Sequence, residues 1–221
     1  MERSDRRIDR RKALAGLGTV GLGTLLAACA GKEPTTSAAV PTSTGSMATV
    51  QPQTTASATD LFDNAGTCTI TAEQTEGPYY FDVDAIRSDI REDRDGVPLR
   101  LAIRVQHATA CTPISNAVVD IWHCDAGGLY SGFESASQGG PGGSRTDQKT
   151  YLRGAQVTNA NGVVEFTTVY PGWYRGRTVH IHTKVHLTTS SVLTTQLYFD
   201  ENVTAAVYQQ SPYNKHTGRD T

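Results

Sequence analysis

The sequence lacks two features that would place it in common functional classes: a membrane-spanning apolar run and an excess of basic residues. The uncharged apolar stretch from Ala13 to Ala28 is shorter than the roughly 20 residues that a transmembrane helix needs. Lys and Arg number 20 against 22 Asp and Glu, whereas nucleic-acid-binding proteins present a clustered basic face. We therefore expect neither a membrane-spanning helix in this stretch nor a nucleic-acid partner.

The first 28 residues have the layout of an export signal instead. Six basic residues precede the apolar stretch and small residues end it, as in a secretory signal peptide. The pair Arg10-Arg11 is typical of a twin-arginine signal. We predict that residues 1–28 are removed as a signal peptide, which leaves 14 basic and 19 acidic residues in a mildly acidic mature chain.

The end of this signal, Leu26-Ala27-Ala28-Cys29, resembles the lipobox of bacterial lipoproteins. Acylation would make Cys29 the first residue of the mature chain and its membrane anchor. We therefore expect an exported protein, lipid-anchored to the outer face of the cytoplasmic membrane or secreted, that touches the membrane only through this anchor. Ordinary cleavage near Ala28 is the alternative, because small residues suit both kinds of cleavage.

Cysteine is scarce, with four residues in the chain. If Cys29 is acylated, Cys68, Cys111 and Cys124 remain, which is an odd number in a compartment that permits disulfides. The simplest expectation is one disulfide and one buried thiol. The sequence does not decide which pair forms, because pairing depends on the distance between Cα atoms.

Residues 29–60 are rich in Thr, Ser, Ala and Pro. No large apolar residue recurs there at the period of a strand or a helix, so the segment cannot bury enough surface to offset its ordering entropy. We predict a disordered linker over 29–60 that joins the signal peptide to one domain over 61–221.

Within that domain the apolar residues alternate or form short blocks bounded by Gly, Pro and Asn, which is typical of strands. No stretch has the pattern of an amphipathic helix of three turns. Many short strands in one domain predict an all-β fold, a single β-sandwich. The expected strands cover 99–106, 117–123, 151–158, 163–169, 178–185 and 195–199.

Two connections in this domain have a distinctive composition. Asn161-Gly162 indicates a hairpin, because both residues tolerate the positive φ of a tight turn. The glycine-rich residues 134–149 predict a loop that is either a flexible lid or plain filler; filler is the preferred interpretation, because only some loops of this length are functional.

His180 and His182 form an H-x-H pair in one predicted strand of a chain with only six histidines. Side chains two positions apart in a strand share a face, so both imidazoles can bind one metal ion. Lys184 and His186 follow on the same face. Two solvent-facing histidines are the alternative.

Tyr174 lies just before this strand, after the turn-forming Pro171-Gly172, so that its phenol can reach the histidine pair. A phenol has an ordinary pKa near ~10, and only a strongly charged cation such as Fe(III) holds it ionised at neutral pH. Two phenolates and one hydroxide neutralise a trivalent ion bound by two imidazoles. Such neutrality suits a buried site, where net charge is costly.

Four separated motifs occur in order along the domain: TEGPYYFD (75–82), CTPISNAVVDIWHCDAGGLYSGF (111–133), GRTVHIH (176–182) and TQLYFD (195–200). In the second motif an acidic residue, Asp120, precedes G-x-[FY] by a fixed gap, and the aromatic residue is Tyr130. From Thr75 to about Asp200 the sequence resembles the intradiol ring-cleavage dioxygenases, such as protocatechuate 3,4-dioxygenase and catechol 1,2-dioxygenase.

This resemblance implies a non-haem Fe(III) centre. Its ligands would be Tyr130 as the equatorial tyrosinate, Tyr174 as the axial tyrosinate, and the imidazoles of His180 and His182. The axial tyrosinate would also act as a base that takes a proton from the substrate.

The resemblance further implies residues that contact the substrate. Arg177, three residues before His180, would stabilise negative charge that develops on the ring, and Gln196 matches an active-site glutamine. Tyr79 occupies a position that contributes to the substrate pocket in some members. The alternative interpretations, without the motifs, are that Tyr130 is a packing aromatic residue, that Arg177 is a surface cation and that Gln196 is an ordinary strand residue.

The expected function is Fe(III)-dependent cleavage of small aromatic diols of the catechol type with O2, which gives cis,cis-muconate-type diacids outside the cytoplasmic membrane. Two alternatives are a copper or zinc enzyme that uses His180, His182 and His186, and a non-catalytic binding module. His123 and His186 are otherwise expected beside the site or in solvent, and His107 and His216 at the surface. The helical dimerisation region of catechol 1,2-dioxygenases has no counterpart in this sequence, so an oligomer stays an open expectation.

Overall fold

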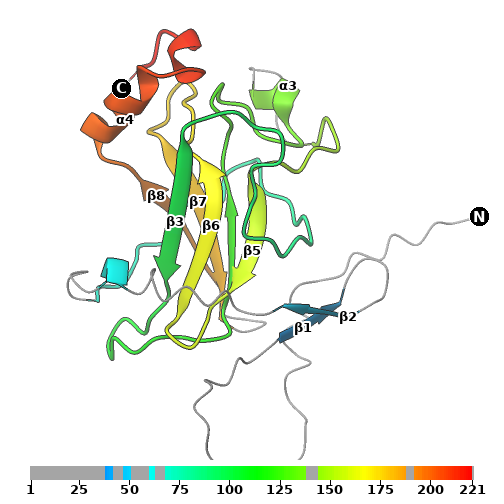
Figure 1. Cartoon of the computed structure of the whole chain (residues 1–221), viewed down its shortest axis with the longest axis vertical. Coiled ribbons are helices and arrows are strands. Elements are labelled where there is room, and N and C mark those ends of the chain that lie inside the picture. Colours follow the sequence, from blue (N-terminus) through cyan, green and yellow to red (C-terminus); the bar gives the residue numbers. More distant parts are fainter. Residues whose placement is uncertain are drawn as a thin grey trace, which may run out of the picture.

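Six antiparallel strands form two sheets that pack face to face (Figure 1). The computed structural model describes residues 38–41, 47–50, 60–62, 68–137, 144–187 and 192–220. One sheet pairs β3 (Pro98–Arg104) with β6 (Val163–Val169), and the other has the order β5 (Arg153–Val157), β4 (Val118–Trp122), β7 (His180–His186), β8 (Val192–Tyr198). The predicted β-sandwich is confirmed, and each of the six predicted strands overlaps one of these.

The core lies between the two sheets because alternate side chains of each strand point inward. Val119 and Ile121 of β4 and Ile181 of β7 meet Val164 and Phe166 of β6 there, and all five are nearly or fully buried. The histidines of β7 therefore lie on the opposite, outer face of the four-stranded sheet.

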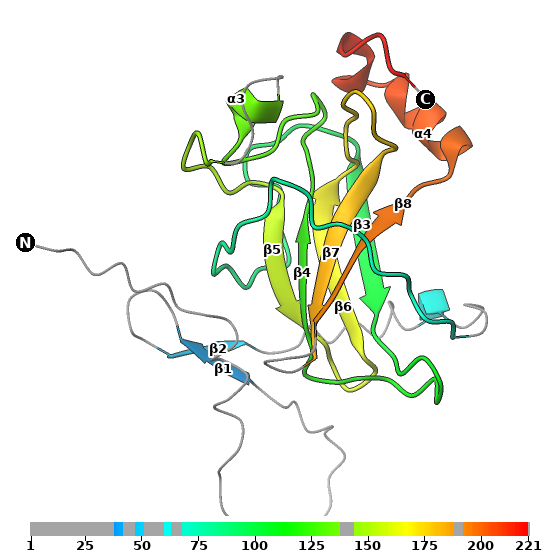
Figure 2. The same cartoon turned by 180° about the vertical axis from the view of Figure 1, so that it is seen from behind.

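That outer face is covered by the segment before β3, residues 68–82, which crosses β4 and β7 in Figure 2. The backbone N–H of Gln74 donates to the carbonyl of Thr194 (2.9 Å), and the hydroxyl of Thr195 donates to the carbonyl of Ala72 (2.9 Å). We call this segment the strap. Because the strap buries the outer face, His180 and His182 are each only 2% exposed, and the alternative of two solvent-facing histidines is wrong.

The turn at Asn161-Gly162 does not form the predicted hairpin. It joins β5 to β6, which belong to different sheets. A tight hairpin turn of this sequence needs positive φ at both central residues, and only Gly162 adopts it (φ 72°). Gly162 instead lies against β3, where its carbonyl accepts the N–H of Val105 (2.8 Å), and the chain crosses from one sheet to the other.

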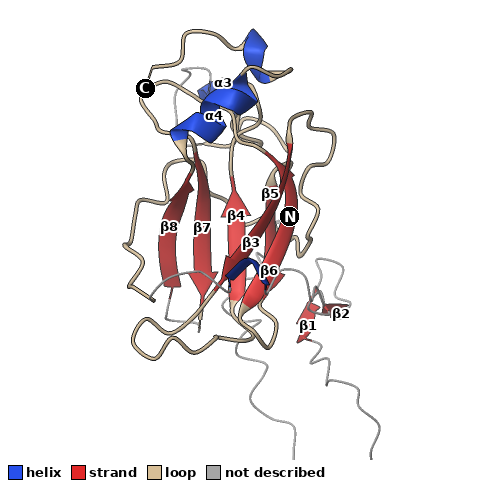
Figure 3. Cartoon of the chain, turned by 60° about the vertical axis from the view of Figure 1, so that its left-hand side comes forward, coloured by secondary structure: helices blue, strands red, loops and turns tan. Residues whose placement is uncertain are grey.

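Helices are short and gather at one end of the sandwich, as Figure 3 shows for α3 (Glu134–Ser137) and α4 (Glu201–Tyr208). The sequence predicted neither; α4 begins where the carboxylate of Asp200 accepts the N–H groups of Asn202 and Val203, and α3 lies inside the predicted loop 134–149. The two 3-10 turns are η1 (Asp60–Phe62) and η2 (Tyr213–Lys215). Among the described residues, none of these helices has the length and apolar character needed to span a membrane.

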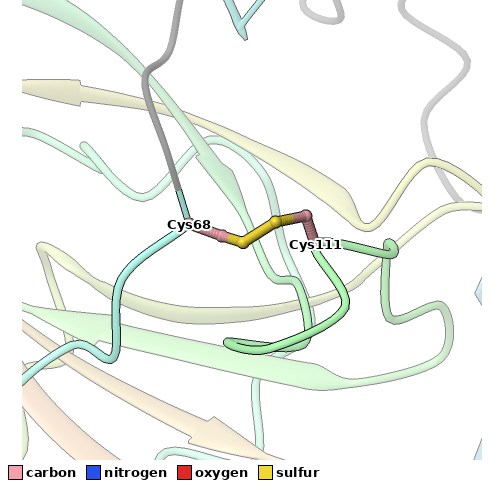
Figure 4. The surroundings of a disulfide bond; sticks show 2 residues. All are labelled: Cys68 and Cys111. Carbon is pink, nitrogen blue, oxygen red and sulfur yellow. A yellow bond between two sulfur atoms is a disulfide. The ribbon is translucent and has the colours of Figure 1, made fainter.

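The disulfide joins Cys68 to Cys111, with a Cα–Cα distance of 5.5 Å. Figure 4 shows that it links the start of the strap to the loop between β3 and β4. Cys124 is a buried free thiol, in agreement with the count of one bridge and one buried thiol among these three residues.

Two further strands, β1 (Ala38–Pro41) and β2 (Met47–Val50), pair antiparallel. They fall within 29–60, the segment predicted as a disordered linker, and that prediction stays a prediction. An isolated pair of short strands is at best marginally stable in water. The predicted signal peptide, Cys29 and the rest of the predicted linker up to Thr59 lie outside the described residues, and those predictions stay predictions.

Candidate metal centre

The centre is built at the end of the sandwich where β7 begins. His180 and His182 are two positions apart in β7, so both rings stand on its outer face. The ring of His182 stacks on Trp122, its register partner in β4, with a centroid distance of 4.8 Å and an interplanar angle of 4°. On the strap, Gly77 (φ 72°) passes so close that a Cβ there would lie 3.3 Å from Cε1 of His182. Trp122 and the strap therefore fix the orientation of this imidazole.

The two tyrosines come from different loops, Tyr130 after β4 and Tyr174 after β6. These loops interlock through glycines. A Cβ on Gly128 would lie 2.3 Å from the carbonyl oxygen of Trp173, and one on Gly172 would lie 2.3 Å from that of Asp125. Only glycine permits such close backbone approach, so the loop sequences bring the two phenols to the same place.

Four donor atoms meet there: the hydroxyls of Tyr130 and Tyr174 and the Nε2 atoms of His180 and His182. The hydroxyls lie 3.4 Å apart, and they are 3.3 Å (Tyr130) and 3.1 Å (Tyr174) from Nε2 of His180. The two Nε2 atoms are 3.1 Å apart. The structure thus brings all four predicted metal ligands together.

This donor set fits a metal ion better than it fits hydrogen bonds alone. Nδ1 of His180 lies 2.6 Å from the carbonyl of Thr178, so Nδ1 carries the proton and Nε2 has one lone pair directed at the cluster. One lone pair cannot serve three polar neighbours. A cation with bonds of about 2.0–2.2 Å, as zinc makes to nitrogen and oxygen, would separate its ligands by the distances observed here.

Burial keeps the four groups neutral at pH 7 when no cation is bound. It raises the pKa of the Tyr130 phenol well above its ordinary value and that of Tyr174 to about 12. It lowers the pKa of His180 to about 4 and that of His182 to about 2. Neutral imidazoles bind metal ions directly, whereas the phenols need a cation to ionise them. The set therefore favours a strongly charged metal ion.

Arg177 and Gln196 form a pair at the edge of this cluster. An Nη of Arg177 donates to Oε1 of Gln196 (2.5 Å), and Nε2 of Gln196 donates to the carbonyl of Thr75 in the strap (2.9 Å). Because a guanidinium only donates and a carbonyl only accepts, the amide of Gln196 has one orientation. Gln196 is 5% exposed, so it is a buried link between the strap and Arg177 rather than an ordinary strand residue.

Tyr79, on the strap, packs against Tyr130 with a ring-centroid distance of 4.8 Å. Its hydroxyl lies 3.5 Å from the carbonyl of Ala136 in α3. Tyr79 is part of an aromatic cluster with Trp122 and Phe133. Tyr79 therefore borders the centre through its contact with Tyr130. The sequence resemblance had implied a position in the substrate pocket.

In the part of the chain that the structure describes, His180, His182 and His186 do not form a copper or zinc site. Along the extended strand, His186 is four positions beyond His182, about 13 Å away. Among the described residues, no three His, Cys, Asp or Glu side chains are arranged to hold a metal ion, so a metal site at this cluster would need the phenols. His123 is fully buried, with its ring nitrogens hydrogen-bonded to the Cys124 carbonyl and the Thr168 hydroxyl. It does not join the cluster.

Two residues that shape the site were missed in the sequence: Trp122 and Gly77. Trp122 stands two positions after Asp120 in the second motif, so the alternation of side chains along a strand could have placed it on the face of the site. Gly77 precedes a proline in the first motif, which is a turn signal.

Comparison with known proteins agrees with this geometry. A family model described as dioxygenase matches residues 75–211. An intradiol ring-cleavage dioxygenase from Tetranychus urticae is 39% identical and superposes with a TM-score of 0.66 over 70% of this chain and 76% of that one.

Two curated relatives are more distant. Catechol 1,2-dioxygenase 1 of Acinetobacter lwoffii is 31% identical over 57% of this chain, and a chlorocatechol 1,2-dioxygenase of Rhodococcus opacus is 29% identical over 50%. The matched regions are 45% and 47% of the relatives' own lengths, so the chain spans about half of each. The family model, the solved relative and the four ordered motifs together place the chain in the intradiol ring-cleavage dioxygenase family.

Proposed function

We propose that this protein is an Fe(III)-dependent intradiol dioxygenase that cleaves catechol-type rings with O2 to cis,cis-muconate-type diacids. The observation that supports it most is the convergence of two phenol oxygens and two imidazole nitrogens, which are joined by four contacts of 3.1–3.4 Å. A ferric ion bound by these four residues would supply the Lewis acidity that ionises both catechol hydroxyls and the redox partner through which the ring reacts with O2.

The two tyrosines differ in burial, which assigns them different tasks in this proposal. Tyr130 is fully buried and packed against Tyr79, so it stays in place as a ligand. Tyr174 is half-buried, so part of its side chain reaches solvent. Once a bound ferric ion had ionised it, the Tyr174 oxygen would be the base that takes a proton from an incoming substrate hydroxyl, because a general base must be a basic oxygen within reach of the substrate.

Arg177 and Gln196 act on charge that develops on the ring. The guanidinium is held in one orientation by Gln196, and a preorganised cation stabilises developing negative charge without reorganisation. Its positive charge already lowers the pKa of Tyr174 against the larger effect of burial, which raises it. Arg177 is therefore close enough to act on an anion bound at the centre.

We also propose that the enzyme works outside the cytoplasmic membrane, on diphenols that reach the cell from outside. The disulfide between Cys68 and Cys111 supports this location, since disulfides persist in oxidising compartments. The twin-arginine pair and the lipobox around Cys29 supply the export and anchoring signals of the same proposal. Fractionation of cells, with and without Cys29→Ala, tests the anchor.

Oxygen uptake by the iron-loaded chain with a panel of catechols tests the activity. We expect consumption of O2 with at least one diphenol and a muconate-type product. The loaded protein should be red-brown from tyrosinate-to-Fe(III) charge transfer, whereas a zinc-loaded chain is colourless. Tyr174→Phe should weaken or shift this band. Tyr151→Phe, at a buried tyrosine hydrogen-bonded to Glu134, should not change it.

No uptake of O2 with any diphenol despite full iron loading contradicts the activity. A chain that takes up no stoichiometric metal would favour a binding module.

A further inference from the structure

Arg153 is an unusual core residue, because its side chain is charged and only 1% exposed. Arginine is almost never fully buried unless it is paired with an acidic group. Among the described residues no carboxylate forms a salt bridge with it, and one of its terminal nitrogens is buried without a hydrogen-bond partner. The buried carboxylate of Asp120 (3% exposed), two positions before Trp122 in β4, acts on Arg153 through its charge, but the hydrogen bonds of the guanidinium lead elsewhere.

The strand register places Arg153 on the same face as the metal centre. Arg153 pairs with Trp122, Trp122 pairs with His182, and His182 pairs with Gln196. Directly opposed residues of neighbouring strands point to the same side of a sheet. Arg153 and His182 therefore stand in one cross-strand row, two strand spacings or about 10 Å apart, with Trp122 between them.

The guanidinium reaches from this row to the loop that carries Tyr130. Its Nε donates to Oγ of Ser131 (2.8 Å) and one Nη donates to the carbonyl of Ser131 (2.8 Å). Ser131 follows Tyr130 directly and is fully buried. The guanidinium carbon also lies 4.2 Å from the ring centroid of Phe81. Arg153 thus fastens the Tyr130 loop to the sheet that presents His182.

Building on the proposed ferric centre, we propose that Arg153 is a positioning residue of that centre. It holds the Tyr130 loop against the sheet, and its buried positive charge balances the negative charge that the Tyr130 oxygen has when it binds the metal ion.

Two substitutions separate the two parts of this role. Arg153→Lys keeps the positive charge but lacks the planar guanidinium whose N–H groups reach both acceptors of Ser131. Arg153→Gln keeps a hydrogen-bond donor but removes the charge. The control is Arg145→Met, since the guanidinium of Arg145 also lies over the ring of Phe81 (3.9 Å) but the residue is exposed. The measurements are iron affinity by competition with a chelator and the wavelength of the charge-transfer band in the loaded protein.

We expect Arg153→Gln to lower iron affinity about 10–100-fold, the usual effect of losing a residue that supports a metal ligand. Its band should move to longer wavelength, because a phenolate without a nearby cation is a stronger electron donor. Arg153→Lys should keep the wild-type band and lose part of the affinity, and Arg145→Met should change neither. In a Tyr130→Phe background, Arg153→Gln should cost little further affinity.

If Arg153→Gln has the wild-type band and the wild-type iron affinity, the proposal is overturned. It is also overturned if Arg153→Gln lowers iron affinity equally in the wild-type and Tyr130→Phe backgrounds, because the arginine would then not act through Tyr130. If Arg153→Gln does not fold, Arg153→Lys tests the positioning role. An iron affinity of Arg153→Lys equal to that of the wild type overturns that role. A wild-type chain that takes up no iron overturns the proposed function and this inference together. A red-brown wild-type chain with an insensitive Arg153 overturns only the inference.

Discussion

Gly77 offers a direct test of whether the strap positions His182. Alanine at this position has two separable effects. A non-glycine residue in the left-handed region costs about 1–2 kcal/mol. The new Cβ would also lie 3.3 Å from Cε1 of His182, a contact that must relax by a few tenths of an ångström. The ring cannot retreat, because Trp122 stacks on it and it is 2% exposed.

A shift of that size matters for metal binding. Metal–ligand bonds tolerate deviations of only about 0.2 Å, so Gly77→Ala should lower iron affinity about tenfold or more, as loss of a supporting residue does. Gly176→Ala is the matched control. Gly176 has φ 79°, and a Cβ there would meet nothing within 4 Å, so this variant carries the backbone cost alone.

The assay compares both variants in two measurements. Urea unfolding of the metal-free proteins should give similar losses of unfolding free energy, about 1–2 kcal/mol each. Iron competition should then separate them, with weakened binding only in Gly77→Ala. If both variants bind iron as tightly as wild type, contact with the strap does not position His182 and the reasoning is wrong.

Three further outcomes are expected. Replacing Cys68 and Cys111 by Ser should lower the unfolding free energy by about 4 kcal/mol, because the bridge closes a loop across a sequence separation of 43; a loss under about 1 kcal/mol in urea titration would speak against an entropic role. His182→Ala should abolish stoichiometric iron by elemental analysis while His186→Ala keeps it, and iron loss in both would revive a histidine-only site. The pKa of His123, lowered by burial to about 4, means that the unfolded chain takes up a proton that the folded chain does not. His123 should thus contribute a loss of up to about 3 kcal/mol of unfolding free energy as pH falls from about 6.5 towards 4, in addition to the losses from His180 and His182. His123→Gln should reduce this slope in unfolding experiments at several pH values.

The burial of the metal site could not be predicted from β7 alone. Alternation in the sequence shows that His180 and His182 share a face, which is a local property of any extended strand. Whether that face meets water depends on the strap, more than 90 residues earlier in the chain. The bond from Gln196 to the carbonyl of Thr75 is such a long-range contact, and no local pattern encodes it.

The tyrosines illustrate a second limit. Tyr174 was within reach of the histidines by sequence distance, but Tyr130 entered the ligand set only through its motif. The structure brings them to 3.4 Å because Gly128 and Gly172 let two loops approach at backbone distance. Local sequence marks each glycine as a turn residue but does not say which other loop it will touch.

The sequence by itself determined the strands, the sandwich they imply, the shared face of the histidine pair and the motifs that carry the family resemblance. These follow from side-chain period and from residue order, which are local. Only the tertiary structure decided the Cys68–Cys111 pairing, the assignment of β5 and β6 to different sheets, the meeting of four donor atoms and the burial of Arg153 beside the Tyr130 loop. Each of these depends on distances between segments far apart in the chain, which packing of the whole domain sets.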